Sequence, residues 1–169
     1  EWRTRDPNLS GLISLCKALQ GLTNPTHLDL ANCELSRKGA KRVAMAIAAG
    51  APIDALTIQS TGHSRYENGR NIYTLTAGED NVELKNLDIG PEDVSLISMW
   101  LATIAGVAVT RVILKRNPLT GGQSWQYDAD VTGVTALVDA LATSSVTELD
   151  LAVCKLGPSS VHEVAKYVR

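Results

Sequence analysis

The sequence predicts an α/β solenoid of about four strand–helix repeats, with parallel strands on the concave face and helices on the convex face. Three observations predict this fold. A short apolar motif recurs along the 169-residue chain, and an apolar helical stripe follows the motif. The chain also contains no Phe and only 4% aromatic residues, a composition that suits a core of repeated aliphatic layers.

The recurring motif predicts the strands. Leu28–Leu35 and Leu149–Leu156 both read LxLxxCxL, and Val112–Leu119 reads VxLxxNxL. Leu56–Thr61 begins in the same way and then departs from the pattern. Side chains alternate along a strand, so the first two apolar residues of each motif should point inward.

A small polar or thiol residue follows each predicted strand and should turn the chain away from it. Its side chain can bond the backbone of the neighbouring turn, because short polar side chains compete well for nearby backbone groups. The motif places four residues at this position: Cys33, Thr61, Asn117 and Cys154.

The segments after the motifs predict helices. Val43 and Ile47 follow Leu35 by eight and twelve residues, and Val164 and Val168 follow Leu156 at the same offsets. This i, i+4 spacing makes an apolar helical stripe. Gly-Pro pairs at 90–91 and 157–158 stand where two helices should begin, since Pro suits a first helical turn. The strand-to-strand spacing of 28 residues between Leu28 and Leu56 is typical of a solenoid.

These motifs resemble the ribonuclease-inhibitor-like leucine-rich repeats, a type also found in intracellular immune receptors and Ran GTPase-activating proteins. The resemblance covers roughly Leu9 to Val168, with two interruptions. It implies a curved solenoid that mostly binds other proteins. We therefore expect a single leucine-rich-repeat domain over residues 1–169, belonging to a longer solenoid.

The first interruption is an insert at about 62–88 in repeat two. Its two β-prone runs, Ile72–Thr76 and Val82–Leu87, flank a Gly-Glu-Asp-Asn turn and predict a hairpin. An alternative is that Leu84 or Leu87 opens a further, irregular repeat strand. The hairpin is favoured because the triplets Ile-Gly-Pro at 89–91 and Leu-Gly-Pro at 156–158 align so well.

The second interruption is an insert at about 121–130 in repeat three, a Gly-rich, acidic loop that carries Trp125 and Tyr127. Exposed aromatic residues are favoured anchors at interfaces. The alternative is that Trp125 folds back over a helix end. Tyr73 in the first insert is a further candidate contact, whereas Trp100 lies on a helical stripe and is expected to be partly buried against its neighbours. Both inserts should project from the same rim, because both leave from a strand's C-terminal side.

The outward strand positions form the second candidate binding surface. They make a face of mixed charge, to which Asp29 contributes on the first strand. The third row is basic, with Arg111 and Lys115, and is extended by Arg116. The fourth row is acidic, with Glu148 and Asp150. In a parallel stack Arg111 should lie beside Glu148, so part of this charge is expected in a lateral salt bridge. The alternative is a merely solvated face.

Several function classes are disfavoured by the composition. The net charge of −2 gives no global field for nucleic acid. No apolar run is long enough to span a bilayer. Three cysteines without a CxxC pair indicate neither a disulfide framework nor a zinc site. The Asp128–Asp130 pair lacks the other ligands of a calcium loop. We expect a cytoplasmic protein that is not an enzyme and carries no metal or cofactor.

The leading functional hypothesis is therefore a protein–protein interaction module that binds through the concave strand face and the rim inserts. A second hypothesis is a regulator of a small GTPase, for which Arg65, Arg70 or Arg116 could supply a cation to the transferred phosphate. A third is a structural segment of a larger solenoid, which would show edge-to-edge self-association.

Overall fold

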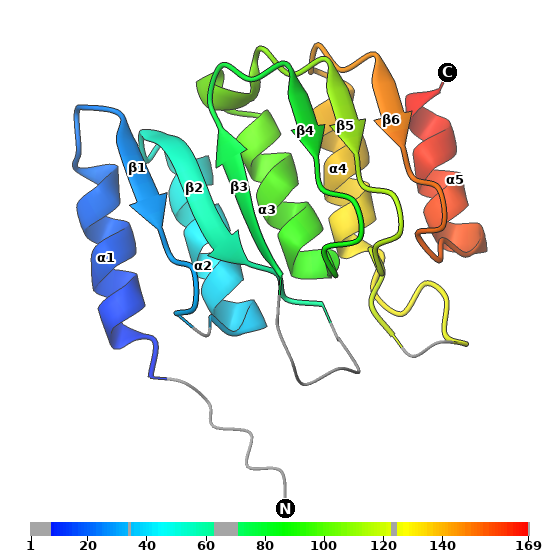
Figure 1. Cartoon of the computed structure of the whole chain (residues 1–169), viewed down its shortest axis with the longest axis horizontal. Helices are drawn as coiled ribbons and strands as arrows, with labels where there is room; N and C mark the ends of the chain where they lie inside the picture. The colour runs from blue at the N-terminus through cyan, green and yellow to red at the C-terminus, as the bar shows by residue number, and fades with distance from the viewer. Residues whose placement is uncertain (1–7, 34, 63–70, 123–124, 169) are drawn as a thin grey trace, which may run out of the picture.

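Strands and helices form two layers in the computed structural model (Figure 1), which describes residues 8–33, 35–62, 71–122 and 125–168. These residues make a mixed α/β fold of five α-helices, one short 3-10 helix and six strands. In chain order the elements are α1 (Ser10–Gln20), β1 (Thr26–Asp29), α2 (Arg37–Ala48), β2 (Ile53–Gln59), β3 (Ile72–Thr76), β4 (Asn81–Glu83), α3 (Pro91–Leu101), η1 (Ile104–Gly106), β5 (Arg111–Ile113), α4 (Thr132–Leu141), β6 (Glu148–Asp150) and α5 (Pro158–Tyr167).

The strand layer consists of two small sheets, ordered β1-β2-β3 and β4-β5-β6. β1 pairs with β2 in parallel, and β4, β5 and β6 are parallel to one another. β3 alone runs against its neighbour, β2. Figure 1 shows the six strands side by side in chain order, with β3 opposite in direction to the other five.

The helix layer follows the same order, because α1, α2, α3, α4 and α5 each pack against the next. Aliphatic side chains from both layers fill the space between them, and Leu56, Ile58, Ile97 and Leu114 are fully buried there. Trp100 of α3 is also fully buried, whereas its position on a helical stripe predicted only partial burial.

The starts of the helices confirm the role of the Gly-Pro pairs. Gly90 and Gly157 are the N-cap residues of α3 and α5, and a proline follows each cap in the first turn. Proline is tolerated there because its missing N–H would have no intrahelical partner. α2 begins differently, since the Ser36 hydroxyl accepts a hydrogen bond from the N–H of Gly39.

At Asn117 the turn position after the strand has the predicted bonding role. The Asn117 side chain accepts hydrogen bonds from the N–H groups of Leu87 (2.9 Å) and Ile89 (3.1 Å), which belong to the neighbouring turn. Its amide nitrogen donates to the carbonyls of Leu84 (2.6 Å) and Leu114 (2.7 Å). One buried side chain thus satisfies backbone groups of two adjacent turns, which would otherwise be unpaired.

The same turns share an unusual backbone conformation. The second residue after the last strand leucine has a positive φ in four turns: Asn32 (55°), Asn86 (54°), Arg116 (60°) and Val153 (62°). Asn tolerates this left-handed conformation, whereas a β-branched residue such as Val is strained in it. The recurrence shows that the chain leaves these four strands by one common turn.

The predicted hairpin between Ile72–Thr76 and Val82–Leu87 is wrong. A turn does join β3 to β4, but β3 pairs antiparallel with β2, and Val82 of β4 pairs in parallel with Val112. Val82 and Leu84 are both buried, as the first two apolar residues of a repeat motif should be. β4 is therefore a further parallel strand, as in the alternative, but it spans Asn81–Glu83 and ends before Leu84 and Leu87, which were expected to open it.

This correction changes the number of parallel strands and the extent of the insert. Five strands, not four, run in the common direction within the described residues. The second half of the segment 62–88 is a strand of this layer followed by its own helix, α3, so only the part that contains β3 is additional. β3 consequently has no helix of its own.

Candidate functional site

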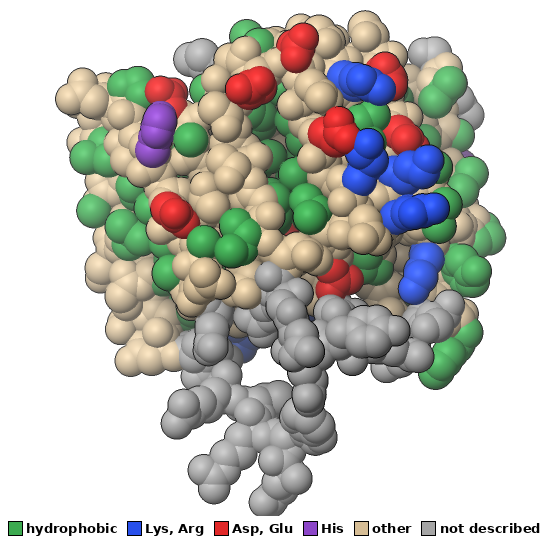
Figure 2. Space-filling view, viewed as in Figure 1, with side chains coloured by type: hydrophobic (Ala, Val, Ile, Leu, Met, Phe, Trp, Pro, Cys, Tyr) green, Lys and Arg blue, Asp and Glu red, His purple; other side chains and the backbone are tan. Residues whose placement is uncertain are grey.

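Basic side chains gather on one half of the exposed strand face. Figure 2 shows Lys and Arg clustered over β4–β6 and the turns that follow them, with several acidic side chains among them, while the half over β1 and β2 shows acidic and His side chains. Five residues supply this charge: Lys85, Arg111, Lys115, Arg116 and Lys155. The basic third row that the sequence predicts is therefore part of a larger cluster, which also includes residues of the neighbouring turns.

Two of these cations are paired with acidic neighbours. The Arg111 Nε lies 2.9 Å from Glu148 Oε1 across adjacent strands, so the predicted lateral salt bridge is confirmed. Lys85 pairs with Glu83, and this contact lowers the pKa of the Glu83 carboxyl. Exposed pairs of this kind stabilise a protein by less than about 1 kcal/mol.

The two predicted aspartates of the face have local structural roles. Asp29 accepts a hydrogen bond from the N–H of Ala31 at 2.8 Å, and Asp150 accepts one from Ala152 at 2.9 Å. Lys115, Arg116 and Lys155 make no ion pair with any residue that the structure describes. These three cations are therefore the part of the basic cluster that has no acidic partner among the described residues.

The loop after β5 exposes both of its aromatic side chains. Trp125 is 74% exposed and Tyr127 is 57% exposed, so Trp125 does not fold back over a helix end. The loop leaves β5 through Gly121 and Gly122, whose φ angles of 65° and 83° favour glycine. Residues 123 and 124 of this insert lie outside the described residues.

Asp128 ties the same loop to the N-terminus of α5. Its carboxylate accepts hydrogen bonds from the N–H groups of Gly157 (3.0 Å) and Ser159 (2.8 Å), and from the Ser160 hydroxyl. These hydrogen bonds lower the pKa of Asp128, and the bond from the Ser160 hydroxyl has the largest effect. Asp130 in turn accepts from the N–H of Thr132 at the start of α4. Both carboxylates thus cap helices. This capping role accounts for the two acidic residues without a bound cation.

The exposed aromatics lie next to the basic turns. A Cβ atom added at Gly157 would lie 3.0 Å from the Cβ of Tyr127, so the loop rests against the segment that follows β6. In that segment Val153 is 70% exposed, and the N–H of Arg116 donates to the carbonyl of Ala152 at 2.9 Å. We call the resulting surface the aromatic rim; it consists of Arg116, Trp125, Tyr127, Val153 and Lys155.

Tyr73 is not part of any exposed surface, which corrects its assignment as a partner contact. It is only 3% exposed, and its hydroxyl donates to Asp93 Oδ1 at 3.1 Å. Burial, followed by the nearby Asp93 charge, raises the pKa of Tyr73 well above its usual value. Its position in β3 turns the ring inward, toward the first turn of α3.

Asp93 itself is a buried carboxyl group that the sequence-based search did not single out. Its Oδ2 accepts hydrogen bonds from the N–H of Gly90 (2.8 Å) and from both the N–H (2.7 Å) and the hydroxyl (2.8 Å) of Thr61. Burial raises its pKa to about 6 despite these donors. The signal in the sequence is an acidic residue three positions after Gly90, where a capping carboxylate is expected. Asp93 joins the end of β2, β3 and α3.

The remaining reactive side chains in the described part of the chain have structural environments. The Cys154 thiol donates to the carbonyl of Leu114 at 3.1 Å, and burial raises its pKa, as expected for a structural cysteine. No cluster of potential metal ligands occurs among the residues that the structure describes. His63, Arg65 and Arg70 lie outside the described residues.

The sequence matches no protein-family model and no curated protein. None of the helices in the described part of the chain is both long and apolar enough to cross a membrane.

Proposed function

We propose that the chain is a leucine-rich-repeat interaction module that binds another protein through the aromatic rim and the adjoining basic face of β4–β6. The single observation that carries this proposal is the exposure of Trp125 and Tyr127 on a loop that Asp128 fixes in place. Large aromatic side chains that are exposed before binding bury much area at a small entropic cost. Anchoring the loop lowers that cost further.

The solenoid assignment has its own support in the geometry. Parallel strands and neighbouring helices follow each other in chain order, and four turns share a left-handed residue at one motif position. Asn117 bonds two successive turns in the manner that a stacked repeat requires. We propose a cytoplasmic location as well, with which the free thiols of Cys16, Cys33 and Cys154 are compatible.

A quantitative pull-down from cell lysate tests the proposed surface. The immobilised wild-type chain should enrich at least one protein, and Trp125→Ala with Tyr127→Ala should reduce that enrichment by tenfold or more, as expected for loss of an anchor worth about 1.4 kcal/mol or more. Arg116→Glu with Lys155→Glu should also reduce it, with a stronger effect at low salt. Circular dichroism must first show that each variant is folded.

The matched control is a charge reversal on the helix layer, Lys17→Glu with Lys41→Glu, which changes the net charge equally but leaves the aromatic rim intact. This control should retain the captured protein. If the rim variants and the control capture the same proteins equally well, the aromatic rim is not the binding surface.

A further inference from the structure

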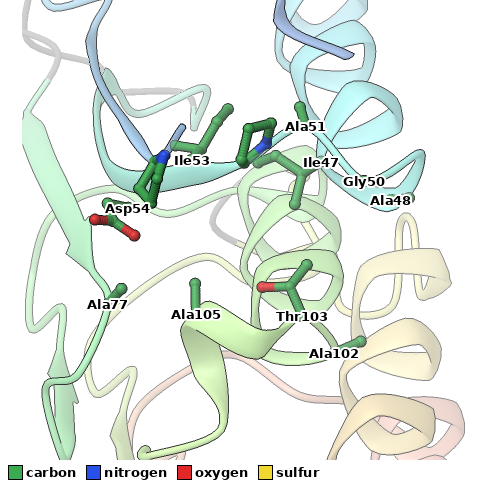
Figure 3. A pocket seen from close by; sticks show the side chains of 12 residues that line it. Ile47, Ala48, Gly50, Ala51, Ile53, Asp54, Ala77, Ala102, Thr103 and Ala105 are labelled. Carbon is green, nitrogen blue, oxygen red and sulfur yellow. The ribbon is translucent and has the colours of Figure 1, made fainter. Parts of the chain in front are cut away.

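A cavity of about 520 Å³ opens between the C-terminal ends of α2 and α3 (Figure 3). The residues from Ile47 to Asp54 form one wall, and Ala77, at the end of β3, forms the next. Ala102, Thr103 and Ala105, which follow α3, close the other side. Ala48, Gly50 and Ala102 are exposed, so the cavity reaches the surface. It is separate from the aromatic rim, which lies at the opposite ends of the strands.

The extra strand explains why this space is not filled. β3 widens the strand layer by one strand but brings no helix, while α2 still packs directly against α3. The ends of these two helices must therefore cover one strand more than the other helix pairs do. Half of the twelve lining residues are Ala or Gly, whose side chains are too small to close the gap.

Asp54 gives this cavity a defined charge. The register of β1 on β2 passes from Thr26↔Ile53 to His27↔Ala55, so Asp54 occupies an irregularity and has no partner residue in β1. Its half-buried side chain makes no hydrogen bond or ion pair with the residues that the structure describes. Figure 3 shows its carboxylate at the edge of the cavity, on the side of Ala77.

Nothing in the lining balances that charge. The twelve lining residues include no Lys, Arg or His, and Asp54 is the one charged residue among them. The C-terminal ends of α2 and α3 also border the cavity, and helix C-termini carry a partial negative charge that favours cations. Ile47 and Ile53 offer apolar surface beside the carboxylate.

We propose that this cavity binds a small aliphatic amine, with its ammonium group against the Asp54 carboxylate and its methylene chain against Ile47, Ile53 and the alanines. The size agrees, because small-molecule sites usually enclose roughly 300 to 1,000 Å³. An apolar wall with one convergent charged group is also the usual composition of such a site. This ligand is independent of the protein partner proposed above.

An NMR titration with three ligands of equal length tests the proposal. n-Pentylammonium, 1-pentanol and pentanoate are each added to the ¹⁵N-labelled chain. n-Pentylammonium should shift the amide signals of Gly50, Asp54, Ala77 and Thr103 and bind about fivefold more tightly than 1-pentanol, as expected for a partly exposed ion pair. Pentanoate should bind more weakly than both.

Asp54→Asn should abolish the preference for n-pentylammonium over 1-pentanol while leaving 1-pentanol binding unchanged. The control is Glu79→Gln, which removes an exposed carboxylate from the nearby β3–β4 turn without touching the cavity. It should retain the preference. Equal binding of the three ligands by the wild type, an unchanged preference in Asp54→Asn, or amide shifts confined to other regions would each overturn the proposal.

Discussion

Val153 combines a strained backbone conformation with an exposed apolar side chain. Its φ of 62° lies in the left-handed region, and its side chain is 70% exposed, so little packing offsets the strain. Replacing Val153 by Asn, the residue found at the same position in two other turns, should stabilise the fold by about 1 kcal/mol. Urea denaturation at equilibrium measures this change.

Val107 provides the matched control for this prediction, because it is 68% exposed and its φ is not positive. Val107→Asn should therefore not raise the free energy of unfolding. If both variants gain the same unfolding free energy, the gain comes from replacing an exposed valine by a polar residue. Relief of backbone strain is then excluded.

Asn117 is the residue on which two turns depend most strongly. Asn117→Ala leaves the N–H groups of Leu87 and Ile89 and the carbonyls of Leu84 and Leu114 without these hydrogen bonds. Buried backbone groups without partners are costly, so we expect a loss of about 2 to 4 kcal/mol in unfolding free energy. The measurement is again equilibrium denaturation.

Asn71→Ala serves for comparison, since the side chain of Asn71 makes no hydrogen bond with the described residues. It should change the free energy of unfolding by less than about 0.5 kcal/mol. A loss below about 1 kcal/mol in Asn117→Ala would contradict the bonding role assigned to this side chain.

At the scale of elements, the sequence predicts the strands that carry a complete motif. β1, β5 and β6 follow from the recurring apolar pair and the small residue behind it, and the Gly-Pro pairs predict the starts of α3 and α5. β4 was misassigned because Leu87 stands where the other turns carry Cys, Asn or Thr. The pairing of β3 with β2 depends on contacts between distant residues, which no local pattern reveals.

The first turn of α3 should make stability depend on pH. Asp93 has a pKa of about 6 in the fold, above its usual 3.8, because burial disfavours the charged carboxylate. The folded state therefore binds this proton more tightly than the unfolded chain does. Its contribution to stability is fully present below pH 3.8 and is lost as the pH rises through about 6.

Asp93→Asn removes this titration and isolates its effect. Relative to the wild type, the variant should gain about 2 kcal/mol of unfolding free energy between about pH 4 and pH 7. Denaturation curves at several pH values measure the difference, and the exposed Asp139→Asn should show no such gain. A constant difference between wild type and Asp93→Asn across this range would show that Asp93 titrates near its usual pKa.

At the scale of the whole molecule, the candidate site was only partly predictable. The Gly-rich composition of the loop predicts that it runs over the surface, but it leaves open whether Trp125 is exposed or folds back over a helix end. The outward strand positions predict the Arg111–Glu148 pair, which follows from the parallel register. The burial of Tyr73 was not predictable without knowing that β3 lies over α3. There the Asp93 carboxylate accepts a hydrogen bond from the Tyr73 hydroxyl.

The edge formed by β6 and α5 leads to the last prediction. β6 pairs only with β5 in the described part of the chain, and α5 buries only Ser160 completely. Val161 on α5 and Val168 at its C-cap are exposed, and Leu149 and Leu151 in and after β6 are only partly buried. Since an unpaired strand and an apolar helix surface lie together, we expect the chain to self-associate through this edge as its concentration rises.

Val161→Lys with Val168→Lys should weaken that association about tenfold or more, because it places two like charges in the contact. Sedimentation equilibrium over a range of concentrations gives the dissociation constant. Val107→Lys adds one positive charge, half that of the double variant, at a comparably exposed valine in the segment between η1 and β5, away from β6 and α5, and should leave the constant unchanged. A wild-type chain that stays monomeric at every concentration would show that the β6–α5 edge is protected without a partner.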